Sequence, residues 1–248
     1  LPGYSVFDAA AARRAARRLF ERYGAVRCKR PDGVGGLGQS VHDDFDSLAA
    51  AIDAVEPAEW ASGWVLEADL RPARTLCVGQ VCIGGAVASY VGHQRATRNN
   101  EGQAVYGGST ITVVRGGYGA LAALDLDAGL RLAIAQAEAY DAAAHAAYPG
   151  MFVSRANVDI AQGSDGRGCE RSGVLEQSWR IGGASAAELA AFARLQADPG
   201  ATRVVASTVE VYGADPEVPP RASVHYRGAD AHGGPLLKYT VIDDDGHA

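Results

Sequence analysis

The sequence has few lysines. Lys29 and Lys238 are the only ones among 23 basic residues, and every other basic residue is arginine. A compact ammonium group on a slim side chain fits a narrow phosphate site better than the planar guanidinium group does. Lys29 comes just before a glycine-rich loop at residues 32–38, and it is therefore our first candidate for phosphate binding. The alternative is a lysine that persists by chance on a solvated strand edge.

Other features are missing as well, and each absence excludes a class of protein. The net charge is -6, whereas binding to nucleic acid needs a basic surface, so we expect no nucleic-acid partner. No apolar run is long enough to span a bilayer, so we expect no membrane partner. The four cysteines are scattered, with none of the CxxC spacing of a zinc site. We expect reduced thiols in a cytoplasmic protein.

The length and composition are those of a soluble globular protein. The chain has 248 residues, of which 48% are hydrophobic and 21% charged, enough for one large domain or two small lobes. It begins at Leu1 without a signal-peptide pattern. That start favours a fragment of a longer protein.

The pattern of apolar residues predicts a mixed α and β fold. Helices are expected at residues 9–23, 45–55, 127–147 and 185–198. Asp8 and Gly24 would cap the first helix, and Ser185 with Glu188 would form a capping box on the last. Strands are expected at residues 25–30, 39–42, 64–70, 74–89 (two strands around a turn), 109–114, 152–161, 173–181, 202–212 and 236–242. A polar loop is predicted at residues 92–108, and irregular structure at residues 213–235.

Gly33, Gly35 and Gly38 match the pattern GxGxxG, which has three interpretations. A dinucleotide site would need a helix to begin at these glycines, but the strand-like residues 39–42 come first. The Walker pattern fails because Lys29 precedes the loop instead of ending it. A strand–glycine loop–strand flap, whose backbone N–H groups close over phosphates, fits best. The alternative is a glycine-rich hairpin without a ligand.

A second group of polar residues lies far along the chain. Asn157 and Asp159 share one face of an expected strand. Glu176, Ser178 and Arg180 share one face of the next strand. Antiparallel pairing of these strands would set Asp159 beside Glu176, and two neighbouring carboxylates repel unless a cation bridges them. Hard oxygen ligands favour Mg²⁺, although a solvated polar face with an Asp–Arg pair explains the same pattern.

In their order along the chain, these motifs resemble the ATP-grasp superfamily. Residues 2–8 (PGYSVFD) resemble the start of its ATP-binding lobe, where a helix leads to a strand with the phosphate-binding lysine, here Lys29. Residues 64–70 (WVLEADL) are similar to the hinge strand that holds adenosine. Residues 157–159 (NVD) and 175–183 (LEQSWRIGG) resemble the metal-binding end. The likeness runs through most of the chain.

The resemblance implies an α+β fold in which two lobes with antiparallel sheets grip ATP between them. A small lobe with the lysine strand and glycine flap is expected at residues 1–70, and a large lobe with the metal-binding hairpin at residues 71–248. Many members of the family also have an upstream substrate lobe and a second phosphate-binding lysine. Both are expected to be missing from this chain.

The resemblance also implies roles for particular residues. The phosphates of ATP would be bound by Lys29, Gly35, Gly36 and Gly38. Adenosine would be bound by Glu67, Asp69 and Leu70. Mg²⁺ would be bound by Asp159, Glu176 and Ser178, where Ser178 stands at a position at which the family commonly has Asn. Arg180, together with Lys29, would be catalytic by stabilising the transferred phosphoryl group.

These roles imply an ATP-dependent ligase that activates a carboxylate as an acyl phosphate for attack by an amine or another nucleophile. The candidates for binding the acidic substrate are His93, Arg95, Arg98 and Asn99, and an ordinary exposed turn is the alternative for this segment. The partners would be small molecules, and a homodimer remains open.

Two other functions are compatible with the sequence. A nucleotide-binding module without chemistry is favoured by Ser178 and by the missing upstream lobe. A Rossmann-type oxidoreductase is the weaker alternative. It requires a helix that begins at Gly38, and a strand there would exclude it.

Overall fold

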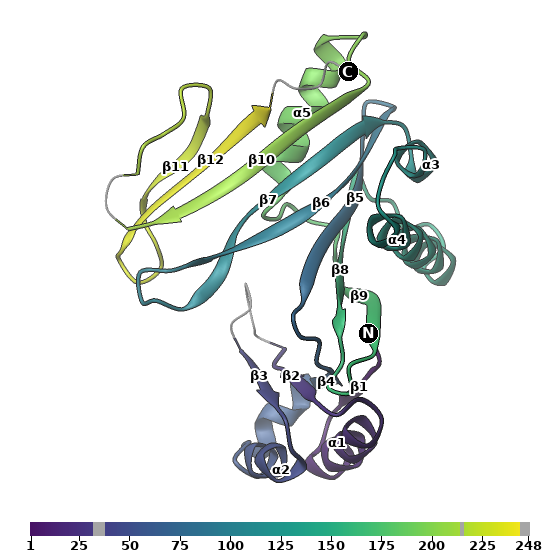
Figure 1. The fold of residues 1–248 in the computed structure, drawn as a ribbon, viewed down its shortest axis with the longest axis vertical. Coiled ribbons are helices and arrows are strands. Elements are labelled where there is room, and N and C mark those ends of the chain that lie inside the picture. The colour runs from purple at the N-terminus through teal and green to yellow at the C-terminus, as the bar shows by residue number, and fades with distance from the viewer. Residues whose placement is uncertain (32–37, 214–215, 244–248) are drawn as a thin grey trace. The chain divides into compact units, whose positions relative to one another are not determined.

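The computed structural model describes residues 1–31, 38–213 and 216–243, and the chain divides into two compact units. The first unit comprises Leu1–Arg74 and Ala161–Gly173, and the second comprises Thr75–Ile160 and Val174–Ala248. Figure 1 shows the elements of both. The sequence analysis predicted a boundary after residue 70, and no local pattern indicated that residues 161–173 belong to the first unit.

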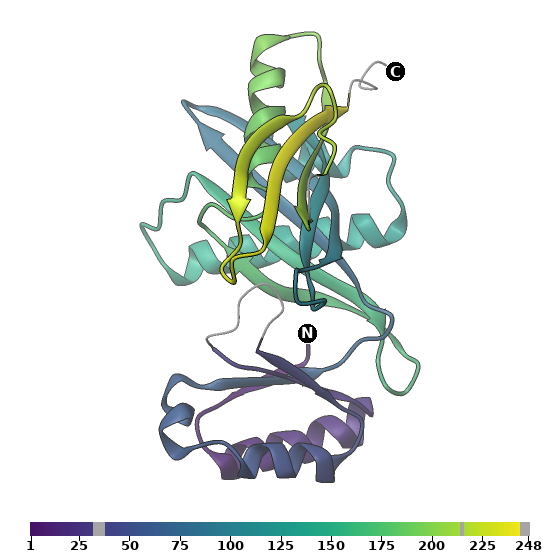
Figure 2. The same ribbon diagram turned by 90° about the vertical axis from the view of Figure 1, so that its left-hand side faces the viewer.

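The first unit is a four-stranded antiparallel sheet with helices on one face. Its elements are β1 (Gly3–Val6), α1 (Ala9–Tyr23), β2 (Val26–Lys29), β3 (Gln39–His42), α2 (Phe45–Asp53), the 3₁₀ helix η1 (Pro57–Ser62) and β4 (Trp64–Ala68). The strand order is β1-β4-β2-β3, and each neighbouring pair is antiparallel. Helices α1 and α2 lie side by side along one face of the sheet (Figure 2).

The caps of α1 form as the sequence predicts. The Asp8 carboxylate accepts a hydrogen bond from the backbone N–H of Ala11 at 2.6 Å, which satisfies a donor at the start of the helix. Gly24 ends the helix with φ of 78°, a left-handed conformation that costs glycine little. The predicted extent of this helix is therefore confirmed.

Alternation along β2 and β4 divides the sheet into an apolar and a polar face. Val26 and Cys28 of β2 and Leu66 of β4 enter the core beneath the two helices. Because successive side chains of a strand point to opposite faces, Lys29 and Glu67 lie on the face away from the helices. The sequence therefore determines which side of the sheet carries charge.

The second unit is built on an eight-stranded sheet. Its elements are β5 (Arg74–Ile83), β6 (Ala86–Arg98), β7 (Ala104–Arg115), α3 (Tyr118–Ala122), α4 (Ala128–Ala147), β8 (Arg155–Ser164), β9 (Glu170–Ser178), α5 (Ser185–Ala197), β10 (Arg203–Tyr212), β11 (Ser223–Ala229) and β12 (Pro235–Asp243). The strand order is β11-β12-β10-β7-β6-β5-β8-β9. The tip of the β8–β9 hairpin belongs to the first unit.

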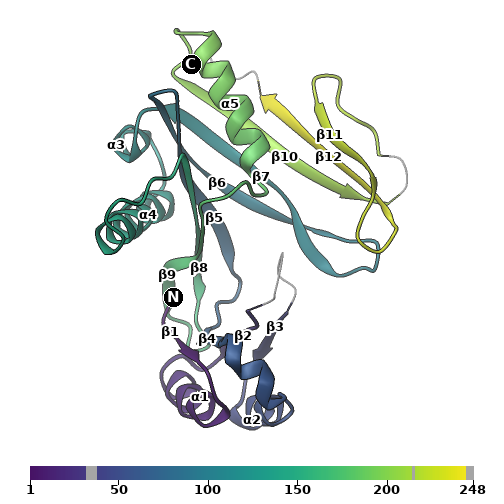
Figure 3. The ribbon, with the colours of Figure 1, turned by 180° about the vertical axis from the view of Figure 1, so that it is seen from behind.

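Both faces of the larger sheet are covered by helices (Figure 3). Ala187, Ala191 and Leu195 of α5 pack on one face, in a core that also contains Tyr90. Residues of α3 and α4 pack on the other face, in a core that also contains Val158 and Ile160 of β8. Residues of β8 with odd numbers therefore face α5, whereas those with even numbers face α3 and α4.

The tip of the β8–β9 hairpin packs on the end of α1 within the first unit. The Arg167 guanidinium donates hydrogen bonds to the carbonyl oxygens of Glu21, at 2.7 Å, and Phe20, at 3.3 Å. Those carbonyls belong to the last turn of α1, where cations are favourable. The Asp165 carboxylate holds the turn by accepting from the backbone N–H groups of Arg167 and Cys169.

The predicted α+β class with antiparallel sheets is confirmed. The prediction of a polar loop at residues 92–108 is wrong, because β6 and β7 form one long hairpin through most of that segment. The irregular segment at residues 213–235 likewise contains strand β11. In the described ranges, no helix combines the length and the apolarity needed to cross a membrane.

The predicted capping box of α5 is also wrong. The N-cap is Ala184, which has no side chain able to accept a hydrogen bond. The Ser185 hydroxyl accepts instead from the backbone N–H of Gly182 at 2.8 Å. Glu188 is drawn away from the helix end by an ion pair with Arg155. Glu188 therefore forms an ion pair with Arg155 from a distant part of the chain instead of a capping hydrogen bond at the start of its own helix.

The Rossmann-type alternative is excluded by the residues after Gly38. They form strand β3, which pairs antiparallel with β2, so no helix begins at the glycines. The strand–loop–strand connection predicted around them is confirmed at both ends. Gly33, Gly35 and Gly36 themselves lie outside the described residues.

Candidate functional site

The polar face of the first sheet carries Lys29. Its ammonium nitrogen lies 2.5 Å from Glu67 Oε1, and the Lys29 side chain is 18% exposed. Within the described part of the chain, that Glu67 oxygen is buried and accepts no other hydrogen bond. Lys29, which is predicted to bind phosphate, is therefore held in place by Glu67, which is predicted to bind adenine.

Asp69, predicted to reach ribose, accepts hydrogen bonds from two arginines. Arg27 donates to its Oδ1 through Nε at 3.0 Å and through Nη2 at 2.6 Å. Arg71 donates to Oδ2 at 2.5 Å and also contacts Asp43. The Asp69 side chain is buried, so these bonds balance a charge that water does not reach.

Two further predicted nucleotide ligands can be placed. Gly38 has φ of 75°, and its carbonyl accepts from the backbone N–H of Arg30 at 3.0 Å, which closes the base of the glycine loop. Leu70 is buried just after β4. Gly35 and Gly36 lie outside the described residues. Lys29, Gly38, Glu67, Asp69 and Leu70 thus all belong to the first unit.

In the second unit, Asp159 is an acidic side chain without a cation. It is 8% exposed and projects from β8 toward the α5 face. Asn157 Nδ2 donates to its Oδ1 at 2.9 Å, and the Gln94 side chain lies close enough to lower the pKa of Asp159. No Lys, Arg or His of the described ranges forms an ion pair with it. Burial raises the pKa of Asp159, and the nearby Glu176 carboxylate raises it further, against the lowering effect of the two amides.

The other residues of the predicted metal site lie at the end of β9. Glu176 is exposed, and its negative charge raises the pKa of Asp159. The Ser178 hydroxyl donates to the carbonyl oxygen of Arg180 at 3.4 Å. Strand β9 ends at Ser178, so the prediction that Arg180 continues the strand is wrong, and its guanidinium bonds the neighbouring Ile181 carbonyl at 3.0 Å.

Sequence reasoning missed a buried network that leads to Asp159. Arg155 forms a two-pronged ion pair with Glu188, at 3.1 and 2.7 Å, and the Glu188 side chain is fully buried. Tyr90, also fully buried, donates its hydroxyl proton to Asn157 Oδ1 at 2.9 Å. Burial, and then the charge of Glu188, raises the pKa of Tyr90 well above its ordinary value, so this hydroxyl stays protonated and able to donate. The sequence signal for this network is the spacing of two between Arg155, Asn157 and Asp159, which puts the three side chains on one face of a strand.

The candidate substrate residues have local partners. Asn99 Oδ1 accepts from the backbone N–H groups of Glu101 and Gln103, and Arg98 Nη1 donates to the Gly102 carbonyl, so both shape the tip of the β6–β7 hairpin. Arg95 donates to the Thr208 carbonyl at 3.0 Å.

His93 and Gln94 differ in the face of β6 that they occupy. His93 is exposed and precedes Gln94, whose side chain acts on the pKa of Asp159, so His93 occupies the opposite face of the strand. Gln94, which was not among the predicted substrate ligands, is thus the residue of strand β6 whose side chain lies near Asp159.

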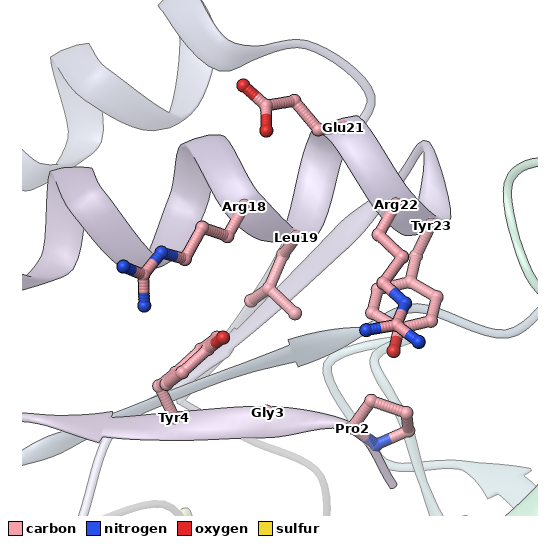
Figure 4. A pocket seen from close by; sticks show the side chains of 8 residues that line it. All are labelled: Pro2, Gly3, Tyr4, Arg18, Leu19, Glu21, Arg22 and Tyr23. Atoms are coloured by element: carbon pink, nitrogen blue, oxygen red, sulfur yellow. The ribbon is translucent and has the colours of Figure 1, made fainter.

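The first unit also contains a pocket of about 530 Å³ between β1 and α1. Figure 4 shows Tyr4 of β1 beneath Leu19, with Arg18 and Arg22 of α1 beside them. This pocket lies on the helix side of the sheet, whereas Lys29 and Glu67 occupy the other face. It therefore does not include the predicted nucleotide ligands.

The donors in the second unit fit Mg²⁺. Within the described residues, no three His, Cys, Asp or Glu side chains form a metal-binding group by themselves. Mg²⁺ commonly needs only one or two carboxylates, and it takes its remaining ligands from water and substrate phosphates. Asp159 and Glu176 supply two carboxylates of this kind, and among the described residues no cation pairs with Asp159.

The fold and these side chains define a two-unit α+β protein with an ion-paired sheet face in one unit and an uncompensated acidic pair in the other. The chain belongs to the family described as "Protein of unknown function (DUF3182)", which matches residues 1–240. A search of curated proteins gave no match. Among solved structures, the chain is similar to D-alanyl-alanine synthetase A from Vibrio cholerae O1 biovar eltor, with 16% sequence identity and a TM-score of 0.45. The similarity covers 71% of this chain and 49% of that protein.

Proposed function

We propose that this protein is an ATP-dependent ligase of the ATP-grasp type, which activates a carboxylate as an acyl phosphate for attack by an amine or another nucleophile. The observation that supports this most strongly is the acidic pair of the second unit. Asp159 is buried, accepts a hydrogen bond from the Asn157 amide and lies near Glu176. A protein that holds a carboxylate in this state without a cation is prepared to bind one.

In the first unit, we propose that Lys29 binds phosphate oxygens at the base of the flap that contains Gly35, Gly36 and Gly38. Glu67 fixes the Lys29 ammonium before the nucleotide arrives, so little side-chain entropy is lost on binding. Glu67, Asp69 and Leu70 are proposed to contact adenosine. The arginine partners of Asp69 would hold its carboxylate in one position, where it could also accept from a ribose hydroxyl.

In the second unit, we propose that Asp159, Glu176 and Ser178 hold Mg²⁺ and that Arg180 stabilises the transferred phosphoryl group. When bound, Mg²⁺ would neutralise phosphate oxygens and favour their displacement. Arg180 is exposed, and within the described ranges its guanidinium bonds only the neighbouring Ile181 carbonyl, so it can turn toward a phosphate at little cost. Its contribution would be a charge-assisted hydrogen bond that strengthens in the transition state.

The acidic substrate is proposed to meet the segment that contains His93, Arg95, Arg98 and Asn99. Arg95 and Arg98 carry the positive charge suited to a carboxylate. Among the described residues, each of the two donates to a backbone carbonyl through one N–H group, so other guanidinium N–H groups are left for a ligand. The substrates would accordingly be small molecules.

The proposal is tested by turnover of ATP. The protein is mixed with ATP, Mg²⁺ and pools of carboxylates and amines, and the release of ADP and phosphate is measured together with new amide products. We expect release that depends on both a carboxylate and Mg²⁺ and that falls at least a hundredfold in Lys29→Met, in line with the loss of a key electrostatic contact. Turnover that is unchanged in Lys29→Met would contradict the assignment.

A control is needed because Lys29→Met also leaves Glu67 buried without its partner. The double variant Lys29→Met/Glu67→Gln removes both charges and separates loss of folding from loss of phosphate binding. Lys29→Arg keeps the charge but changes its shape, and we expect it to retain the fold with weaker ATP binding.

A nucleotide-binding module without chemistry is the second candidate function. Two local bonds favour it, because both Ser178 and Arg180 direct their side chains to backbone carbonyls beside them. ATP binding that is saturable in a titration, with no ADP release in any substrate pool, would support this second function over the first.

A further inference from the structure

We propose that Tyr90 and Asn157 are positioning residues for Asp159, which fix its carboxylate in the orientation that binds a divalent cation. The inference rests on the proposed function, since the cation is the Mg²⁺ assigned there to Asp159. It adds to that function two residues that do not themselves bind the metal.

The bond directions are determined by the chemistry of the groups. An ionised carboxylate only accepts hydrogen bonds, so the Asn157 amide must turn its N–H group toward Asp159, as the 2.9 Å contact shows. The amide oxygen then faces Tyr90, where it needs a donor. The Tyr90 hydroxyl provides that donor at 2.9 Å. With both ends of the amide engaged, Asn157 cannot flip without losing two bonds.

Tyr90 is itself held in a single place. It is fully buried in the core beneath α5 and lies against the Arg155–Glu188 pair, both of whose charges act on its hydroxyl. The ring also fills the space over Gly79, where an added Cβ would stand 2.3 Å from Tyr90 Cζ. The hydroxyl is therefore a fixed point from which the orientation of Asn157, and then of Asp159, is set.

A fixed Asp159 matters because its second oxygen must face the ligand. Asn157 occupies Oδ1, while Glu176 approaches from the next strand. Residues that orient a metal-binding carboxylate through hydrogen bonds typically contribute about 10–100-fold to metal affinity. Here the contribution would come through two linked bonds, so the effects of the two residues should not be independent.

The test uses Mn²⁺, which accepts the same oxygen ligands as Mg²⁺, with the full chain and a non-hydrolysable ATP analogue. Binding is measured by the enhancement of water proton relaxation when Mn²⁺ joins the slowly tumbling protein. Tyr90→Phe deletes only the hydroxyl, and Asn157→Leu removes the amide at similar size. We expect Mn²⁺ affinity to fall about tenfold in Tyr90→Phe and about 10–100-fold in Asn157→Leu.

Tyr118→Phe is the matched control. The Tyr118 hydroxyl is also buried, and within the described residues it has no hydrogen-bond partner, but it lies in the core on the α3 and α4 side. We expect this variant to bind Mn²⁺ like the wild type. The double variant Tyr90→Phe/Asn157→Leu should bind no more weakly than Asn157→Leu alone, because Tyr90 acts through the amide. A purely structural role for Tyr90 would change thermal stability without this pattern.

The outcomes distinguish the inference from the proposed function. If Asp159→Asn loses Mn²⁺ binding while Tyr90→Phe and Asn157→Leu keep wild-type affinity, the positioning role is overturned and the metal site stands. If the wild type does not bind Mn²⁺, or Asp159→Asn binds it equally well, both are overturned. Equal losses in Tyr90→Phe and Tyr118→Phe would also overturn the positioning role. Should Tyr90→Phe not fold, the comparison of Asn157→Leu with wild type decides.

Discussion

The polar sheet face of the first unit and the acidic pair of the second unit treat a buried carboxylate in opposite ways. In the first unit, Glu67 is paired with Lys29, and Asp69 is bonded by two arginines. In the second, Asp159 has amide partners and an acidic neighbour. A carboxylate that is already neutralised adds to stability and rigidity, whereas one that lacks a cation reduces stability until a ligand supplies the charge. The contrast separates a sheet face whose charges are already paired from an acidic pair that, on the proposed function, would bind a cation.

The largest effect is expected from the Arg155–Glu188 pair of the second unit, in which the Glu188 side chain is fully buried and the Arg155 side chain is 11% exposed. Arg155→Met leaves Glu188 without a cation in a site that water does not reach. We expect the free energy of unfolding to fall by roughly 3–5 kcal/mol, measured by urea denaturation. Arg155→Met/Glu188→Leu removes both charges and should recover most of that loss. If the single variant is nearly as stable as the wild type, the pair is not buried as described.

A smaller loss is expected in the first unit. Lys29→Met leaves the buried Glu67 oxygen without its partner, and we expect a loss of about 1–3 kcal/mol, because an unsatisfied buried acceptor keeps its desolvation cost. Adding Glu67→Gln should restore part of it. Equal stability of Lys29→Met and wild type would show that Glu67 finds water or another donor.

Asp159→Asn should change stability in the other direction. The pKa of Asp159 is raised in the folded state, chiefly by burial. Its protonated form is therefore favoured by folding, and that contribution is present below the unfolded pKa and is lost as pH rises through the folded pKa. We expect the variant to unfold at a higher temperature than the wild type at neutral pH, with the difference disappearing in acid. A variant that is less stable at neutral pH would indicate that the wild-type carboxylate is already compensated.

The smallest effect is expected away from both polar sets. Arg98 bonds the Gly102 carbonyl on an exposed hairpin tip. Arg98→Ala should change the free energy of unfolding by less than about 0.5 kcal/mol, as exposed substitutions usually do. If its affinity for carboxylate substrates falls while its stability is kept, the proposed substrate role gains support. Unchanged affinity assigns Arg98 to the turn alone.

Local patterns predicted the elements whose signals lie close together in the sequence. Asp8 and Gly24 bound α1 because caps act over a few residues. Asn157 and Asp159 were placed on one face by the period of a strand. Nothing local distinguished the β6–β7 hairpin from a loop, since Gly92 pairs with Ile111 across many residues and its glycine hydrogen is what allows close approach to the Thr110 carbonyl.

The candidate site was predicted only in part for the same reason. The identity of Lys29 and Glu67 could be read from the sequence, but their mutual ion pair depends on strands that are distant along the chain. Glu188 was misassigned because a capping box is a local pattern, whereas its true partner Arg155 comes from β8. Tertiary contacts overrode the local preference in that case.

Gly79 lies in the middle of strand β5 and carries no chemical group of its own that points to a role. A single methyl group there would collide with both the Tyr90 ring and the backbone oxygen of Ala156. Replacement by alanine is thus a way to dislodge the aromatic ring from beneath α5 without touching any charged group. A folded and stable Gly79→Ala variant would show that the interior of the second unit can rearrange around the added methyl group. Loss of stability would show that Gly79 is needed to hold the Tyr90 ring, and through it Asn157 and Asp159, in place.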